Sequence, residues 1–201
     1  IGFPMALQFS ITAIGTMMVQ SALNVLGSIH VAAFTTANKI EQIISQMYVA
    51  LGTTMATYSA QNMGAGKVMR IRKGFRSATV ISFVYSLVFG IITFFWGYHL
   101  TGLFVSENLY LQCVAIFLIP LAVVNIYRNG IQGMGFGLMP MMAGVAELVG
   151  RGVVAVIASR RESYLGICLA SPAAWVLAGA LLLGMYWYIM KILQRKLGKD
   201  A

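Results

Sequence analysis

Charged side chains are scarce in this sequence, and acidic ones are the scarcest. Only 9% of the 201 residues are Asp, Glu, Lys or Arg, with 5 acids against 14 bases, while 59% are hydrophobic. A soluble domain averages about 25% charged residues and needs polar side chains on the surface that faces water. The composition therefore excludes an ordinary soluble domain and favours a protein whose solvent is the lipid bilayer.

Cysteine and histidine are also rare. Cys113 and Cys168 lie inside apolar stretches, and His30 and His99 are far apart in the sequence. These residues form neither a disulfide framework nor a cluster with metal-ligand spacing. No nucleophile–base pair is visible inside the apolar stretches, which argues against an intramembrane enzyme. We therefore expect no enzymatic activity, no metal site and no cofactor.

Apolar runs fill most of the chain. A membrane-spanning helix needs about 20 mainly apolar residues. Runs that meet this requirement cover residues 4–26, 30–58, 77–96, 109–131, 140–158 and 164–190. Pro120 lies in the middle of the fourth run and should kink it, because proline removes a helical hydrogen bond. The predicted fold class is an all-α membrane protein with six transmembrane helices.

The basic residues gather on one side of the predicted spans. The other side holds only Arg160 and Arg161. A net charge of +9 would suggest nucleic-acid binding in a soluble protein, but here the positive-inside rule explains the charges better. We expect no nucleic-acid partner, and we expect both chain ends on the cytoplasmic side of the cytoplasmic (inner) membrane. The ten basic residues on that side are Lys67, Arg70, Arg72, Lys73, Arg76, Arg128, Lys191, Arg195, Lys196 and Lys199.

The second run is unusually polar for a membrane span. Lys39, Gln42 and Gln46 share one face of a helix that turns by about 100° per residue. A charge at mid-membrane costs at least about 2.5–3.5 kcal/mol, so such groups must face protein or a water-filled cavity. They are either hydrogen-bonding groups between helices or the lining of a substrate cavity, and we favour the cavity.

Glu41 points away from Lys39 on the same helix, so the two side chains cannot pair with each other. We assign Lys39 to the cavity, where it would influence which substrates bind. Glu41 faces the other way, and a carboxyl group in that position is a candidate for carrying the coupling ion. These intramembrane charges argue against a purely structural subunit.

Two further pairs stand at a spacing of four residues. Glu147 and Arg151 in the fifth run should form an ion pair on one helix face. That pair is either structural, or Glu147 is a second candidate for binding the coupling ion. Gln20 and Asn24 in the first run are either hydrogen-bonding groups between helices or substrate contacts.

Short motifs along the whole chain resemble those of the multidrug and toxin extrusion family. The second run ends in Ala60-Gln61-Asn62-Met63-Gly64-Ala65-Gly66-Lys67 and then Arg70, which resembles the end of the family's eighth helix. Gly2-Phe3-Pro4 and Val31-Ala32-Ala33 are similar to the starts of its seventh and eighth helices. Gln132-Gly133-x-Gly135 and Glu147-Leu148-Val149-x-Arg151 are similar to patterns around its tenth and eleventh helices.

The resemblance implies a larger protein of twelve helices in two six-helix lobes, with residues 1–201 as the C-terminal lobe. The lack of an initiator Met before Ile1 agrees with a preceding segment. The resemblance also implies an antiporter that exports organic cations or drugs in exchange for protons or sodium by alternating access. Its partners would be a small-molecule substrate, the bilayer and the N-terminal lobe of the same polypeptide.

One position-by-position difference bears on the coupling ion. Sodium-coupled members of that family carry acids at the positions that Thr12 and Leu121 occupy here. Coupling is then expected to depend on the other lobe, or on Glu41 and Glu147. The alternative function within the same superfamily is a lipid-linked oligosaccharide flippase, which has the same fold and a more cationic cavity.

Overall fold

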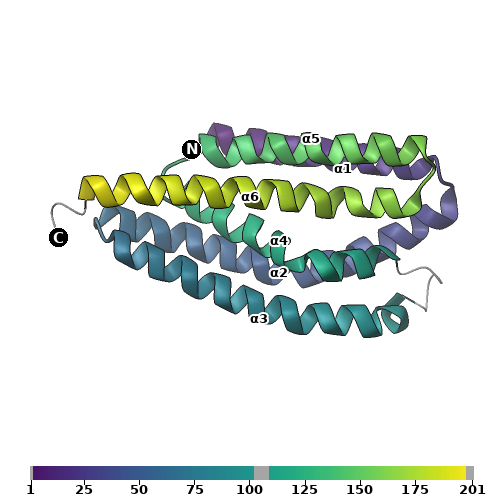
Figure 1. The fold of residues 1–201 in the computed structure, drawn as a ribbon, viewed down its shortest axis with the longest axis horizontal. Coiled ribbons are helices and arrows are strands. Elements are labelled where there is room, and N and C mark those ends of the chain that lie inside the picture. The colour runs from purple at the N-terminus through teal and green to yellow at the C-terminus, as the bar shows by residue number, and fades with distance from the viewer. Residues whose placement is uncertain (1, 102–108, 198–201) are drawn as a thin grey trace.

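The computed structural model describes residues 2–101 and 109–197, and the side chains of residues 6–96 and 109–195. Within these ranges the chain forms six helices, as the apolar runs predicted (Figure 1). The helices are α1 (Gly2–Asn24), α2 (Ser28–Gly64), α3 (Val68–Thr101), α4 (Leu109–Gly133), α5 (Leu138–Arg160) and α6 (Tyr164–Leu197). The fold class predicted from composition is therefore confirmed.

The helices run roughly parallel or antiparallel along one long axis (Figure 1). Helices α1 and α5 pack together on one flank, and α2, α3 and α4 form the other. Helix α6 lies between them, in contact with both α4 and α5. Both described ends of the chain lie at the same end of the bundle, as an even number of spans requires.

Helix α2 stands apart from the others in composition. Among the described residues, α1, α3, α4, α5 and α6 contain stretches long and apolar enough to cross a membrane. Helix α2 is 37 residues long, but the polar side chains noted in the sequence keep it out of that group. Much of its polar surface must therefore face something other than lipid.

Three helices extend beyond the spans expected from hydropathy. Helix α2 continues to Gly64, α3 begins at Val68, and α6 continues to Leu197. Much of the basic segment 61–76, which separates two predicted spans, is therefore helical. Hydropathy marks where a helix leaves the lipid, whereas Lys and Arg are good helix formers that let it continue. At about 1.5 Å per residue, α2 is roughly 55 Å long and exceeds the bilayer hydrocarbon of about 30 Å.

The kink expected from Pro120 is present in α4. Phe117, one turn before the proline, has non-helical backbone angles of φ −103° and ψ 16°. Pro120 has no N–H to donate to the carbonyl group of Ile116, and its ring crowds that carbonyl, so the distortion falls one turn before the proline.

Helices α2 and α4 approach each other very closely at two glycines. A Cβ atom on Gly133 would lie 2.1 Å from the carbonyl oxygen of Ala56, and one on Gly52 would lie 2.9 Å from that of Asn125. Small residues permit such close backbone contact between membrane helices. This contact fixes α2, which carries the candidate site residues, against the centre of the lobe.

Candidate functional site

The polar face predicted on α2 lines a cavity. A hollow of about 370 Å³ lies between α1, α2 and α6. Three of the residues predicted to contact substrate, Gln20, Lys39 and Gln42, lie on its wall. Asn38 accepts a hydrogen bond of 2.8 Å from Gln42 Nε2, which holds that amide against the helix. The residues lining the hollow are Thr16, Val19, Gln20, Phe34, Thr35, Asn38, Lys39, Gln42 and Ser171.

The two remaining predicted cavity residues lie outside this wall. Gln46 is exposed on α2, one turn beyond Gln42. Asn24 accepts a hydrogen bond of 3.4 Å from Gln20 Nε2, so this pair links successive turns of α1. Sequence reasoning did not select Thr16 or Ser171, because a single hydroxyl on an apolar helix does not distinguish a cavity face from a lipid face.

The cavity wall is cationic. Lys39 is exposed, and none of the described residues that line the hollow is acidic. The ammonium group therefore has no carboxylate partner on this wall. A bound molecule with a negative group would be attracted to it, whereas a simple cation would be repelled.

Glu41 lies on the opposite face of α2, as the helical geometry predicted. It is 8% exposed and points into the lobe rather than toward the cavity. Tyr110 of α4 and Arg151 of α5 are close enough to interact electrostatically with its carboxyl group. No hydrogen bond or salt bridge to Glu41 is formed among the residues that the structure describes. Its carboxyl group is thus buried, near a cation, and free of the direct contacts that would fix it.

Glu147 is the centre of a buried ion cluster. Arg151 Nη2 donates to Glu147 Oε1 at 2.7 Å, and Arg128 Nη2 donates to Oε2 at 2.5 Å. The 147–151 contact is the pair that the spacing on α5 predicted. Arg128 was assigned from the sequence to the cytoplasmic edge, whereas the structure places it on Glu147 with its side chain 13% exposed. A single cation in an apolar run was the only sequence signal for this contact.

The two acids and two arginines of this region balance in charge. When both acids are ionised, Glu41 and Glu147 carry two negative charges against the two positive charges of Arg128 and Arg151. The Nε atoms of both arginines are buried without a hydrogen-bond partner. Buried charges are tolerated only when paired. With both acids ionised these four groups are neutral as a whole, and a proton or cation added at either acid would make them positive.

Helix α1 passes directly over this cluster. A Cβ atom on Gly15 would lie 3.3 Å from Arg151 Nη1, so the glycine leaves room for the guanidinium group. Gln132 Nε2 of α4 donates a hydrogen bond of 2.6 Å to Gln8 Oε1 of α1. Thr12 and Leu121, where sodium-coupled relatives would carry acids, are half-buried and buried. The ion cluster thus connects α4 and α5 directly, with α1 and α2 packed beside it.

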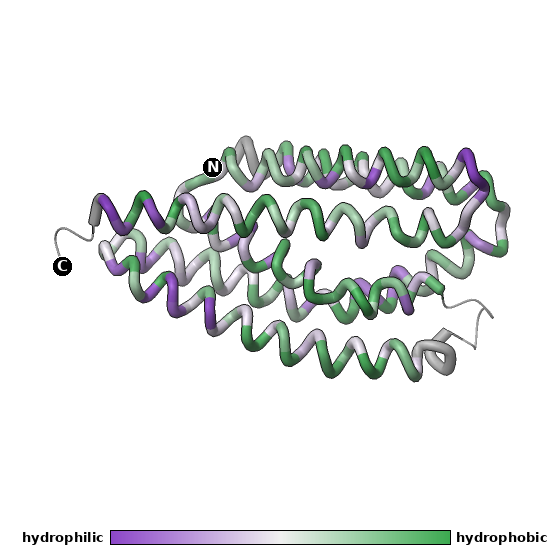
Figure 2. The backbone as a smooth tube through the Cα atoms, in the orientation of Figure 1, coloured by the Kyte–Doolittle hydropathy of each residue, from purple (hydrophilic) through white to green (hydrophobic). Residues whose placement is uncertain are grey.

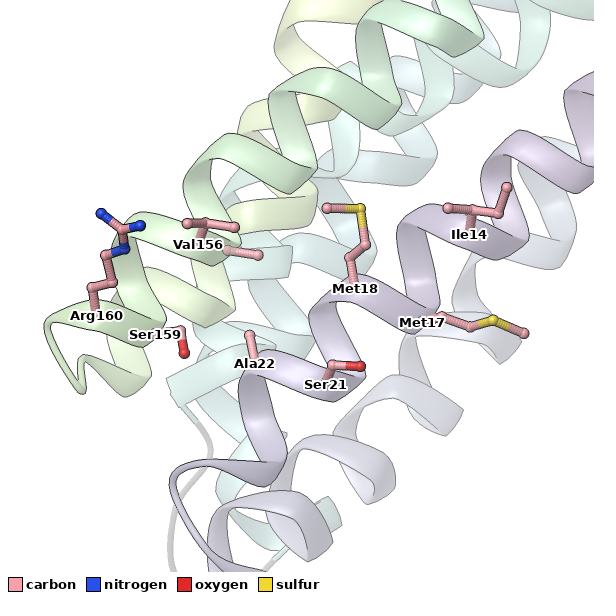
Figure 3. A pocket seen from close by; sticks show the side chains of 9 residues that line it. Ile14, Met17, Met18, Ser21, Ala22, Val156, Ser159 and Arg160 are labelled. Carbon is pink, nitrogen blue, oxygen red and sulfur yellow. The ribbon is translucent and has the colours of Figure 1, made fainter.

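A second hollow, between α1 and α5, has mostly apolar walls (Figure 3). Its volume is about 520 Å³. Met18 reaches from α1 toward α5, where a Cβ atom on Gly152 would lie 2.8 Å from the Met18 methyl group. Arg160 lies at one end of the hollow. With Ser21 and Ser159 as the other polar groups, this hollow offers no carboxylate for an ion. Across the described residues, no group of His, Cys, Asp or Glu is placed to hold a metal.

Comparison with known families gives a match to the model described as MatE over residues 1–157. The "probable multidrug resistance protein YoeA" of Bacillus subtilis is 22% identical over 95% of this chain and 43% of its own length. The "FAD transporter" of Shewanella oneidensis is 23% identical over 88% of this chain and 41% of its own length. The chain thus spans less than half the length of these relatives.

Solved structures show the same fold. A MATE protein crystallised in complex with MaL6 superimposes with a TM-score of 0.88 at 16% identity, covering 97% of this chain and 46% of its own. A MOP superfamily transporter from Pyrococcus furiosus, described as having a binding pocket of reverse polarity, gives a TM-score of 0.87 at 17% identity. It covers 96% of this chain and 46% of its own.

Proposed function

Because the chain belongs to the MatE family, whose members are membrane transporters, we propose that it acts as one lobe of a secondary active antiporter. The proposed activity is export of organic cations and related drugs in exchange for protons or sodium, by alternating access. The observation that carries this proposal is the arrangement of α2, with a polar cavity wall on one face and a buried carboxyl group on the other.

The length of the match supports the division into lobes. This chain of six helices aligns with 41–46% of the relatives and solved structures compared. Transporters of this kind commonly consist of two similar halves that enclose a central site near the middle of the membrane. The cavity between α1, α2 and α6 would then be completed by an N-terminal six-helix lobe of the same polypeptide.

The basic residues support an orientation for this lobe. One end of the bundle carries the α2–α3 turn. At this end, the start of α3 and the end of α6 are strongly hydrophilic (Figure 2). With Arg128 half-buried in its contact with Glu147, nine basic residues remain for that side, against Arg160 and Arg161 at the other. Because basic residues favour the cytoplasmic side of a membrane protein, we propose that the richer side, with both termini, faces the cytoplasm.

Cysteine labelling tests this orientation. In a background without Cys113 and Cys168, a membrane-impermeant maleimide added to intact cells should label Ser28→Cys and should not label Ala65→Cys. Both positions are exposed, Ser28 at the start of α2 and Ala65 in the α2–α3 turn, at opposite ends of the bundle. Ala65→Cys should become reactive after the cells are permeabilised, which controls for its accessibility. The reverse pattern of labelling would show that the orientation is wrong.

The cationic cavity wall supports a second candidate substrate class. Lys39 faces the cavity without an acid on the same wall, so a cationic drug requires that the other lobe supply negative charge. An anionic substrate would instead bind Lys39 directly. One relative is named as an FAD transporter, and FAD carries phosphates. The relatives compared are multidrug resistance proteins and this FAD transporter, which favours small-molecule export over flipping of a lipid-linked oligosaccharide.

Substitution of Lys39 separates the two candidates. If organic cations are the substrates, cells that express Lys39→Ala should export a cationic dye at least as fast as the wild type, because a repulsive charge is removed. If the substrates are anionic, the wild type should export FAD, and Lys39→Ala should lose this activity.

Lys67→Ala is the matched control, because Lys67 is an exposed lysine of the α2–α3 turn away from the cavity. It should behave as the wild type in both assays, with expression checked by immunoblot. The assays should be run under a proton gradient and under a sodium gradient. If cells with the protein export neither compound faster than cells without it under both gradients, the proposed antiport is contradicted.

A further inference from the structure

A third hollow of about 530 Å³ lies on the outside of the bundle, where the first turns of α3 pack against α4 and α6. Its rim carries three cations, Arg72, Lys73 and Arg76, all of which are exposed. It is distinct from the cavity between α1, α2 and α6, since the two share no residue.

The floor of this hollow is a packed aromatic group. The ring of Phe75 lies 5.0 Å from that of Tyr127 and 4.5 Å from that of Tyr186, and the two tyrosine rings lie 5.1 Å apart. Gly130 leaves the space that the Phe75 ring fills, since a Cβ there would lie 2.3 Å from the ring. The Tyr127 hydroxyl is 3.3 Å from Thr79 Oγ1. A floor packed in this way is a formed surface that holds the cationic rim around it.

The cations of the rim have no acidic partner. No salt bridge joins Arg72, Lys73 or Arg76 to any acid among the described residues. Arg72 and Arg76 are also four residues apart on one helix, a spacing at which like charges repel. The positive-inside rule requires basic residues at this end, but it does not require them to surround a hollow. A bound anion would remove the repulsion and satisfy all three groups.

The position of the hollow indicates which anion. Residues 77–96 of α3 carry no charged side chain, and large hydrophobic side chains among them are exposed, including Val80, Phe83, Val84 and Leu87. The cations therefore lie at one end of this apolar stretch, the level expected for lipid phosphates, beside a surface suited to contact with acyl chains. Basic pockets between helices at this depth bind anionic lipid headgroups.

We propose that this hollow binds the phosphate headgroup of an anionic phospholipid, with its acyl chains along the apolar surface of α3. Arg72, Lys73 and Arg76 bind the phosphate oxygens, and the Phe75–Tyr127–Tyr186 group supports the glycerol region. The site does not depend on which compound the protein exports, so it can be tested without transport.

Native mass spectrometry of the delipidated protein in detergent tests the proposal. Phosphatidylglycerol should remain bound under conditions in which phosphatidylcholine with the same acyl chains dissociates. Each cation near an anionic lipid strengthens binding roughly fivefold, so Arg72→Gln, Lys73→Gln and Arg76→Gln together should weaken phosphatidylglycerol binding by roughly 100-fold.

The control removes the same charge from the same end of the bundle. Lys67→Gln, Arg70→Gln and Arg195→Gln together change three exposed cations that do not line the hollow, and should leave binding near the wild-type level. Equal losses in both triple variants would overturn the proposal, because general surface charge would then explain binding. Displacement of the lipid by an equal concentration of inorganic phosphate would also overturn it, because the site would then hold a free anion.

A measurement on the unmodified sequence covers the case in which the triple variant does not fold. Phosphatidylglycerol with a photoreactive group on its headgroup should crosslink to peptides that contain Met69 or Thr79, which also line the hollow. Crosslinks confined to other helices would place the headgroup elsewhere and overturn the proposal.

Discussion

Replacement of Glu147 by glutamine should destabilise the protein more than loss of either arginine that contacts it. The glutamate oxygens accept hydrogen bonds from Arg128 at 2.5 Å and from Arg151 at 2.7 Å. Glu147→Gln leaves the buried guanidinium group of Arg151 and the half-buried one of Arg128 with one neutral partner. Removal of one member of a buried ion pair typically costs about 3–5 kcal/mol, so we expect a large fall in melting temperature in detergent and in the yield of monodisperse protein.

A charge-balanced variant makes this prediction specific. Arg128→Gln combined with Glu147→Gln leaves one arginine, Arg151, and one carboxyl group, that of Glu41, in this region. We expect this double variant to recover most of the stability lost in Glu147→Gln. Glu162→Gln, which alters an exposed acid in the α5–α6 turn, should melt at the wild-type temperature. A double variant that is as unstable as the single one would show that charge balance does not govern this cluster.

Replacement of Glu41 by glutamine should abolish ion-driven export while the protein remains folded. The carboxyl group of Glu41 is buried but makes no direct hydrogen bond or salt bridge within the described residues, so its loss removes no close contact. Arg151 keeps its bond to Glu147. If Glu41 accepts a proton or cation during transport, the lobe must already tolerate its neutral form, which glutamine imitates.

Dye efflux from cells, or uptake into everted vesicles, measures this effect. Glu41→Gln should fall to the rate of membranes without the protein under a proton gradient and under a sodium gradient, at unchanged expression. Glu162→Gln serves again as the control for loss of an acid outside the lobe interior. Wild-type export by Glu41→Gln under both gradients would exclude Glu41 and direct the search to Glu147 and to the other lobe.

The sequence predicted the features that follow from one helix at a time. Apolar runs predicted six helices, Pro120 predicted the distortion at Phe117, and 100° per residue placed Lys39 and Glu41 on different faces. The spacing of Glu147 and Arg151 predicted their contact. Each of these depends only on backbone geometry and on the cost of placing charge in lipid, which are the same in every helix.

Features that depend on two helices were not accessible in this way. The spacing on α5 suggests a self-sufficient pair, whereas Arg128 of α4 shares the same carboxylate. Ser171 of α6 reaches the cavity of α2 for a similar reason, since only packing brings them together. The helix ends were also underestimated, because hydropathy locates the lipid boundary and not the last helical hydrogen bond.

The contact between Gly133 and Ala56 sets a mechanical limit on any transport cycle. Because a Cβ atom at position 133 would overlap the backbone of Ala56, we expect that α2 and α4 do not slide along each other in that half of the lobe without separating first. Any shear between them would have to lift one helix over the other's carbonyl groups. Bending at Phe117 requires no such step, because the helix there already departs from helical geometry. We therefore expect residues 109–116 of α4 to act as a lever on a hinge, while the rest of α4 and the facing part of α2 turn as one body.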